Sequence, residues 1–194
     1  AGMMDCKNAL TEANNDMEKA IELIRKRGQA IAAKRSDRDA SEGCVLAGTN
    51  NDFAAIVAVA CETDFVAKNA DFIALTKSIL DLALTQQPES KEALLALDMD
   101  GLTVADRITD RSGVTGEKME LAEYSFVKGG TVTSYIHPGN KLATIVAFAE
   151  ENAEYETIHG VAMHIAASNP QYNNTTDIPA SEVEKELHIQ TEAA

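Results

Sequence analysis

The 194-residue sequence lacks the features of membrane-spanning, secreted or zinc-binding proteins. No run of about 18 apolar residues exists, so no segment is predicted to span a membrane. No basic segment followed by an apolar stretch opens the chain, as it does in a secretory signal. The three cysteines form no CxxC pair and the four histidines show no HExxH spacing, which argues against a disulfide framework or a zinc site. We therefore expect a cytoplasmic protein that needs no metal or cofactor.

Basic residues are also scarce, with 17 Lys and Arg against 31 Asp and Glu and a net charge of −14. Such a surface repels phosphate groups, so we expect neither nucleic acid nor a membrane as a direct partner. The imbalance is uneven along the chain: residues 1–42 hold eight bases and eight acids, and the remainder carries the whole excess. This asymmetry predicts a small N-terminal module joined to a larger acidic body.

The N-terminal module is predicted to contain two short helices. The first ends near Asn14, and the second begins after Asp16, a good N-cap, and stops at Gly28 in the left-handed conformation. Two helices this short bury their apolar stripes poorly on each other, so we expect a third helix upstream. Residues 34–42 have no apolar period and are interpreted as a linker. The basic residues between Arg25 and Arg38 are expected to form a solvated face.

The body contains an internal repeat at a constant offset of 89 residues. Residues 54–62 and 143–151 align without gaps, and six of the nine positions are identical. The same offset relates turns and helices, in the pairs 48–52 with 137–141 and 72–80 with 161–169. Each copy is therefore predicted to be a hairpin followed by a helix that packs on it.

These patterns predict an α+β fold with antiparallel sheet. An amphipathic helix near residues 91–97 and a polar turn near residues 112–117 are expected between the two copies. The expected divisions are a helical module at 1–33, a linker at 34–42, a first core half at 43–125 and a second, truncated half at 126–194.

The two copies differ directly after the matched strand. The first copy has Asp64 and Phe65 where the second has Ala153 and Glu154. One interpretation is that Asp64 caps the next turn and holds Phe65 outward, as an acidic and aromatic tip that inserts into a partner. The other is that Phe65 packs within the chain against Phe72. The repeat alone leaves both interpretations open.

Several segments resemble bacterial elongation factor Ts over nearly the whole chain. Residues 2–10, 16–21 and 61–69 read GMMDCKNAL, DMEKAI and CETDFVAKN, close to the two signatures of that family. Residues 134–137 and 163–170 add SYIH and MHIAASNP. The resemblance implies a guanine-nucleotide exchange factor that promotes GDP release from elongation factor Tu, and binds it in both GDP-bound and nucleotide-free forms.

The resemblance also implies which residues touch the partner. The tip formed by Thr63, Asp64, Phe65 and Val66 resembles the one that enters the nucleotide-binding domain of elongation factor Tu and disturbs its magnesium site. His137 matches another family position that contacts the partner, and Gly116 of the polar turn matches a further one. The remaining candidates, on the small module, are Met3 and Met4.

The small module has both a family interpretation and a simpler one. In the family its methionines rest on a helix of the partner, whereas Met3 and Met4 read without the family are core of a helical module. The family normally has a helix before Ala1, which completes a ubiquitin-associated-like module, and it continues beyond residue 186. We therefore expect the sequence to be a fragment.

Two other functional classes remain to be compared. A non-catalytic adaptor, in which a ubiquitin-associated-like module is tethered to an inert body, predicts that the Thr63–Val66 tip is dispensable. An enzyme is not expected, because the sequence offers no nucleophile with a base and an orienting group. Cys61 is a poor nucleophile, since Glu62 and Asp64 beside it raise the pKa of a thiol.

Overall fold

The computed structural model describes residues 3–172 and 174–193, so Gly2 of the first signature lies outside the described residues. The helices are α1 (Met3–Glu12), α2 (Met17–Ala33), α3 (Asp64–Ala67), α4 (Ala70–Gln86), α5 (Lys91–Ala96), α6 (Val104–Thr115), α7 (Tyr155–Ser168), the 3₁₀ turn η1 (Thr175–Asp177) and α8 (Ala180–Ala193). The strands are β1 (Glu42–Asn50), β2 (Phe53–Cys61), β3 (Met119–Lys128), β4 (Thr131–Ile136) and β5 (Ala143–Phe148).

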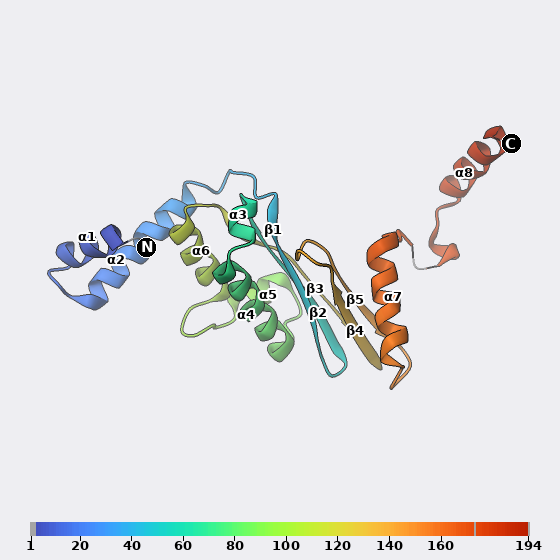
Figure 1. Cartoon of the computed structure of the whole chain (residues 1–194), viewed down its shortest axis with the longest axis horizontal. Helices are drawn as coiled ribbons and strands as arrows, with labels where there is room; N and C mark the ends of the chain where they lie inside the picture. Colours follow the sequence, from blue (N-terminus) through green and yellow to red (C-terminus); the bar gives the residue numbers. More distant parts are fainter. Residues whose placement is uncertain (1–2, 173, 194) are drawn as a thin grey trace.

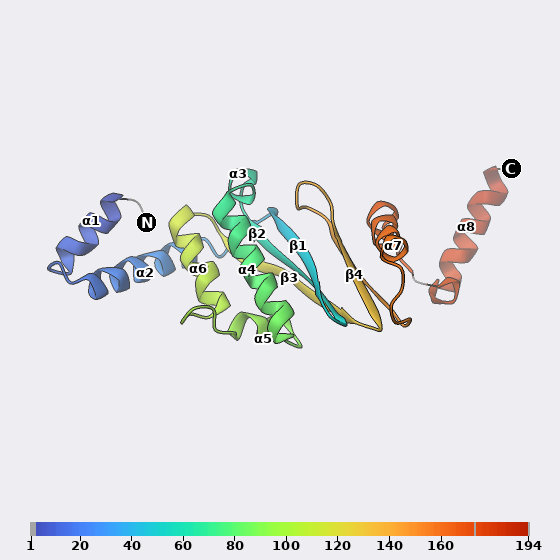
Figure 2. The same ribbon diagram turned by 60° about the horizontal axis from the view of Figure 1, so that its bottom comes forward.

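The body is built in layers, as Figures 1 and 2 show. Strands β1, β2 and β3 form an antiparallel sheet in that order, and helices α4, α5 and α6 cover one side of it. The antiparallel hairpin β4–β5 lies beyond the sheet from those helices, and α7 packs on the far side of the hairpin. The predicted α+β fold with two hairpin–helix units is therefore confirmed.

The two hairpin turns have the same backbone conformation at positions that are 89 residues apart, the offset of the sequence repeat. Asn51, between β1 and β2, and Asn140, between β4 and β5, both adopt a left-handed backbone with φ of 55°. Asparagine tolerates this conformation because its short side chain can bond locally to the backbone. The same residue type thus makes the same bend in both copies.

The principal core lies between the three-stranded sheet and the helices on it. Its largest fully buried side chains include Phe53, Phe72, Ile79 and Leu94. Each such side chain contributes about 1.5–3 kcal/mol when it leaves water. This core fixes the end of β2 and the start of α4, the two elements that flank α3.

The N-terminal helices differ from the prediction at one residue. Asp16 does cap α2, with its carboxylate accepting a hydrogen bond from the Lys19 N–H. Helix α2, however, continues to Ala33, so the expectation that Gly28 stops it is wrong. Gly28 lies inside the helix, against the backbone of Gly113 in α6. Gly28 therefore marks a contact between two helices and not the end of α2.

The segment between the two copies also contains a helix that the sequence analysis missed. Residues 112–117 are predicted to form a polar turn, but residues 112–115 are the last turn of α6, Gly116 is its C-cap and only Glu117 lies beyond it. Val104, Ile108 and Ser112 are its buried residues, at a spacing of four. The buried face is narrow and many of its neighbours are charged, which hides the helical period.

Two further expectations need correction. The boundary placed at residues 125 and 126 falls within β3, which pairs with β2 along its length, so β3 belongs wholly to the first half. The basic residues between Arg25 and Arg38 are not simply a solvated face, because Arg25 pairs with α6. Arg35 and Arg38 pair with Glu62 at the end of β2.

Candidate functional site

The predicted tip is the single helical turn α3, which directly follows β2. Thr63 is its N-cap, and its hydroxyl accepts a hydrogen bond from the Val66 N–H at 3.4 Å, so the cap is Thr63 and not Asp64. Phe65 is 84 % exposed, whereas Phe72 is fully buried. The interpretation that Phe65 packs against Phe72 is therefore wrong. Val66 packs on the core and Phe65 projects from it.

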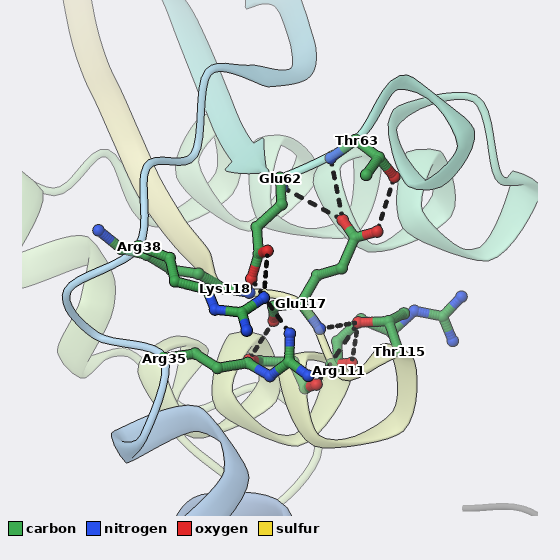
Figure 3. Close-up of polar contacts among 9 residues, drawn as sticks. Arg35, Arg38, Glu62, Thr63, Arg111, Thr115, Glu117 and Lys118 are labelled. Carbon is green, nitrogen blue, oxygen red and sulfur yellow. Dashed lines mark hydrogen bonds and ion pairs between the residues drawn. The ribbon is translucent and has the colours of Figure 1, made fainter.

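One carboxylate holds the base of this turn. Glu117 Oε1 accepts a hydrogen bond from the Thr63 hydroxyl at 2.6 Å. Its Oε2 accepts from the backbone N–H groups of Thr63 and Glu62, at 3.1 and 3.2 Å. Hydrogen bonds to a charged acceptor are stronger than neutral ones, and three on one carboxylate fix the chain where it leaves β2. Figure 3 shows Glu117 reaching across to Thr63.

A second carboxylate makes the reciprocal connection. Glu62 accepts a hydrogen bond from the Lys118 backbone N–H at 2.6 Å and from the Arg38 guanidinium at 2.9 Å, and it pairs with Arg35 at 3.5 Å. The Lys118 N–H, and after it Arg38, hold the pKa of the Glu62 carboxyl below its usual range. Figure 3 shows the two arginines arriving from the segment after α2. The pair Glu62–Thr63, just after β2, is thus hydrogen-bonded in both directions to the pair Glu117–Lys118, just before β3.

Gly116 acts through this arrangement. It is the left-handed C-cap of α6, with φ of 73°, and its N–H donates to the Ser112 carbonyl at 2.8 Å. A side chain is strained in this conformation, so a glycine suits the position. The sharp end that it gives to α6 places Glu117 beside Thr63. The structure therefore brings Gly116 to the base of the tip.

Charge at the tip is balanced by nearby lysines. Asp64 pairs with Lys68 one helical turn away, at 2.7 Å. The hydrogen bond from Lys68 lowers the pKa of Asp64, and the more distant charge of Lys141 adds to the effect. Both members of the Asp64–Lys68 pair are solvent-accessible, so the pair contributes little to stability. The Asp64 carboxylate is therefore charged and accessible to a partner.

The turn that carries His137 lies at the same end of the body as the tip. The Val45 N–H donates to the Asn140 carbonyl at 2.7 Å, and Lys141 pairs with Glu42 at 2.7 Å. Glu42 is paired across the sheet with Cys61, two residues before Thr63. In both ribbon views the β4–β5 turn and α3 lie at the same edge. Two candidate contacts thus share one surface.

His137 directly follows β4, is exposed, and is positioned by a residue of that strand. The Tyr135 hydroxyl lies 2.9 Å from its Nδ1 atom. The Tyr135 ring in turn meets His159 of α7 edge-on, with ring centroids 5.8 Å apart. Helix α7 therefore supports the strand residue that orients His137.

Met3 and Met4 lie apart from the tip, on α1 at one end of the elongated molecule (Figure 1). They are 88 % and 63 % exposed, so the interpretation of both as core of a helical module is wrong. The small core of this module is formed instead by Ala9, Ala13 and Ala20. Two exposed methionines give the module a flexible apolar surface.

Few groups suited to catalysis or metal binding occur in the described residues. Burial, and after it Glu117, raises the pKa of the Cys61 thiol to about 11. Within residues 3–172 and 174–193, no three His, Cys, Asp or Glu side chains are grouped so that they could hold a metal ion. No helix in that part of the chain is long and apolar enough to cross a membrane.

Comparison with known proteins matches this architecture to one family. The family model described as Elongation factor TS matches residues 62–194. An elongation factor Ts of Porphyromonas gingivalis is 58 % identical over 195 residues, covering all of this chain and 71 % of the relative. That of Phocaeicola vulgatus is 58 % identical over 97 % of the chain and 57 % of the relative, and that of Bacteroides thetaiotaomicron 53 % over 99 % and 58 %.

The chain belongs to the elongation factor Ts family. It is shorter than these relatives, in keeping with the expectation of a fragment of an elongation factor Ts. Its α+β body and its signature segments agree with that membership.

Sequence reasoning about this elongation factor Ts chain missed the residues that support the tip. The sequence alone indicates for Glu117 only membership of a polar turn, and for Glu62 only a position beside Cys61. One signal does point to Glu117, because it directly follows Gly116, which the family resemblance implies as a partner contact. Its partner Thr63 is 54 residues away, however, and no periodic pattern joins the two.

Proposed function

We propose that this chain releases GDP from elongation factor Tu by inserting the Thr63–Val66 tip beside the magnesium and phosphate site of that protein. Membership of the elongation factor Ts family gives the chain its general role, nucleotide exchange on elongation factor Tu in translation elongation. The observation that carries the insertion mechanism is Phe65, 84 % exposed on a turn that Glu117 holds at its base.

The magnesium ion is a suitable target for such a tip. Mg²⁺ demands near-ideal octahedral geometry and joins nucleotide phosphates to the protein that binds them. An aromatic ring that displaces the groups around the ion therefore removes a large share of the affinity for GDP. By linkage, GDP weakens the binding of this chain to elongation factor Tu by the same factor as this chain weakens the binding of GDP. Elongation factor Tu can therefore exchange one for the other during the cycle.

The other candidate residues are proposed to hold the partner while the tip acts. His137 contacts it beside the tip, Gly116 shapes the base of the tip, and Met3 and Met4 rest on an apolar surface of the nucleotide domain. The net charge of −14 favours a protein partner over nucleic acid or a membrane surface, and we propose that the chain works in the cytoplasm.

We further propose that the chain is not an enzyme. Exchange makes and breaks no covalent bond, so it needs no acid, base or nucleophile. The pKa of Cys61, about 11, supports this proposal because the thiolate is nearly absent at neutral pH.

The test is release of fluorescent mant-GDP from elongation factor Tu across a Mg²⁺ titration, with wild type, Phe65→Ala and His137→Ala. Chelation of Mg²⁺ should make intrinsic release fast, so that wild type adds little. At millimolar Mg²⁺ the acceleration by wild type should be largest, and Phe65→Ala should remove most of it. His137→Ala should weaken binding but keep the dependence on Mg²⁺.

Two outcomes would contradict parts of this proposal. Acceleration that is independent of Mg²⁺ and survives Phe65→Ala would overturn the metal-site mechanism but leave the exchange role in place. Binding without any acceleration would favour the adaptor, for which the tip is dispensable.

A further inference from the structure

Helices α2 and α6 cross at two glycines, where their backbones meet. A Cβ atom added to Gly113 would lie 2.4 Å from the Cα of Gly28 and 3.0 Å from its carbonyl carbon, too close for any side chain. A Cβ atom added to Gly28 would lie 3.5 Å from the Cα of Gly113, an ordinary contact. The crossing therefore depends on the missing side chain at Gly113 in particular.

Charged side chains flank this crossing on the side nearer the start of both helices. Arg25 of α2 pairs with Asp106 at 3.3 Å and with Asp110 at 3.7 Å, both on α6. Beside the crossing lies an apolar cleft of about 530 Å³, lined in part by Ile21 and Val114. The backbones of the two helices approach each other most closely at this crossing, so a methyl group added to Gly113 would force the helices apart at that point.

A second attachment joins the same module to the tip. Arg35 and Arg38 lie just beyond the end of α2, and both pair with Glu62. Glu62 directly precedes Thr63, the N-cap of the tip. The segment interpreted as a linker is therefore bound to the base of α3, as Figure 3 shows.

The joint consists of the Gly28–Gly113 crossing and the ion pairs of Arg25, Arg35 and Arg38. We propose that it holds the N-terminal module in a fixed position on the body, so that the methionines of the module and Phe65 bind elongation factor Tu as one preassembled two-point surface. Figures 1 and 2 show α1 at one end of the molecule and α3 on the body, with α2 and α6 between them. The inference rests on the proposed function for the identity of the partner.

The physical advantage of such a joint lies in affinity. Once one point has bound, the second binds as an intramolecular event, with an effective concentration on the order of millimolar even for a flexible connection. A rigid joint also avoids the entropy cost of ordering the module on the partner. Opening the joint should therefore weaken binding and leave the action of the bound tip unchanged.

The experiment uses the whole chain with Gly113→Ala, and with Gly28→Ala and Gly160→Ala as matched controls. Gly160 lies inside α7, where an added Cβ atom meets nothing within 4 Å. Spin labels on the native Cys6 of α1 and on Lys77→Cys of α4 report the position of the module, because Cys44 and Cys61 are buried. Calorimetry gives the Kd for elongation factor Tu, and mant-GDP release gives the maximal rate.

We expect a narrow label distance for wild type and both controls, and a broad one for Gly113→Ala. The Kd should rise about tenfold or more in Gly113→Ala, with the maximal release rate within twofold of wild type. Replacing both Met3 and Met4 by alanine should weaken binding strongly in wild type but little in Gly113→Ala.

The failures of the two proposals are distinguishable. If Gly113→Ala shows a narrow distribution of label distances or an unchanged Kd, the proposed role of the joint is wrong, whatever the rate of GDP release. Wild type that binds tightly without accelerating release overturns the exchange mechanism, and the pattern of Kd values still decides the joint.

Discussion

Glu117 holds Thr63 by two groups at once, accepting from its hydroxyl at 2.6 Å and from its backbone N–H at 3.1 Å. The two residues are 54 positions apart in the sequence, and the helices that cover the sheet lie between them along the chain. Because Thr63 is also the N-cap of α3, the carboxylate determines where the exposed ring of Phe65 stands. A side chain at the base of the turn thus orients the ring that is proposed to enter the partner.

The first prediction is that Glu117→Ala slows exchange with Phe65 still in place. The change leaves three donors without their acceptor, each hydrogen bond to a charged group being worth about 1.5–3 kcal/mol. We expect the maximal release rate to fall about tenfold and the amides of Glu62 and Thr63 to exchange hydrogen faster. The measurements are mant-GDP release and hydrogen exchange, with Glu123→Ala on β3 as the control. Unchanged release with faster amide exchange would show that tip order is irrelevant.

The second prediction separates the exposed phenylalanine from a buried one. Phe65→Ala should leave the free energy of unfolding nearly unchanged, because the ring is 84 % exposed, and should cut exchange at least about tenfold, or about 1.4 kcal/mol. Phe72→Ala should cost about 3–5 kcal/mol of stability, since it empties a core position. Denaturant unfolding and nucleotide release, measured on the same preparations, test both. A large loss of stability in Phe65→Ala would contradict the proposed role.

The third prediction concerns the orientation of His137. Tyr135→Phe removes one hydroxyl, 2.9 Å from Nδ1 of His137, and keeps the ring that meets His159. We expect binding to elongation factor Tu to weaken about threefold to tenfold. The free energy of unfolding should fall by at most about 1 kcal/mol, the net worth of one hydrogen bond. Tyr155→Phe removes the hydroxyl of another tyrosine, whose ring stacks on His159, and serves as the control. The ¹⁵N chemical shifts of the His137 ring, which report its tautomer, should change only in Tyr135→Phe.

The repeated parts of the fold were accessible from sequence. Each copy has a strand of small and β-branched residues, a turn with asparagine at the same position, and an apolar helical period after it. Asn51 and Asn140 share a φ of 55°, so the alignment at an offset of 89 residues had a physical basis in both backbones. Local rules act over a few residues, and these elements obey them.

The parts that failed depend on contacts between distant residues. Gly28 follows three basic residues, which is typical of a helix end, but α2 continues past it and packs there against Gly113 of α6. The repeat alone could not decide whether Phe65 is core or surface, because the answer depends on how Glu117 holds Thr63. Tertiary contacts here override local signals, and they do so at the residues proposed to act.

The last prediction uses the pH dependence of stability to test the second carboxylate at the tip. The Lys118 N–H, and after it Arg38, lower the pKa of Glu62 in the folded chain. In the window between this lowered pKa and the ordinary one, the unfolded chain binds more protons, so stability rises with pH through the window. The contribution of Glu62 is complete above the ordinary carboxyl pKa and is lost as the pH falls through the folded-state value.

Glu62→Gln keeps an acceptor for the Lys118 N–H but removes the charge that attracts Arg35 and Arg38. We expect it to lower the free energy of unfolding at neutral pH by on the order of 1 kcal/mol, with a difference from wild type that shrinks toward zero at acid pH. Asp64→Asn is the control, because Asp64 also has a lowered pKa but its pair with Lys68 is solvent-accessible and easily screened. Urea unfolding at a series of pH values checks both variants. A difference for Glu62→Gln that stays constant down to the acid limit would mean that the carboxylate charge does not hold the linker arginines.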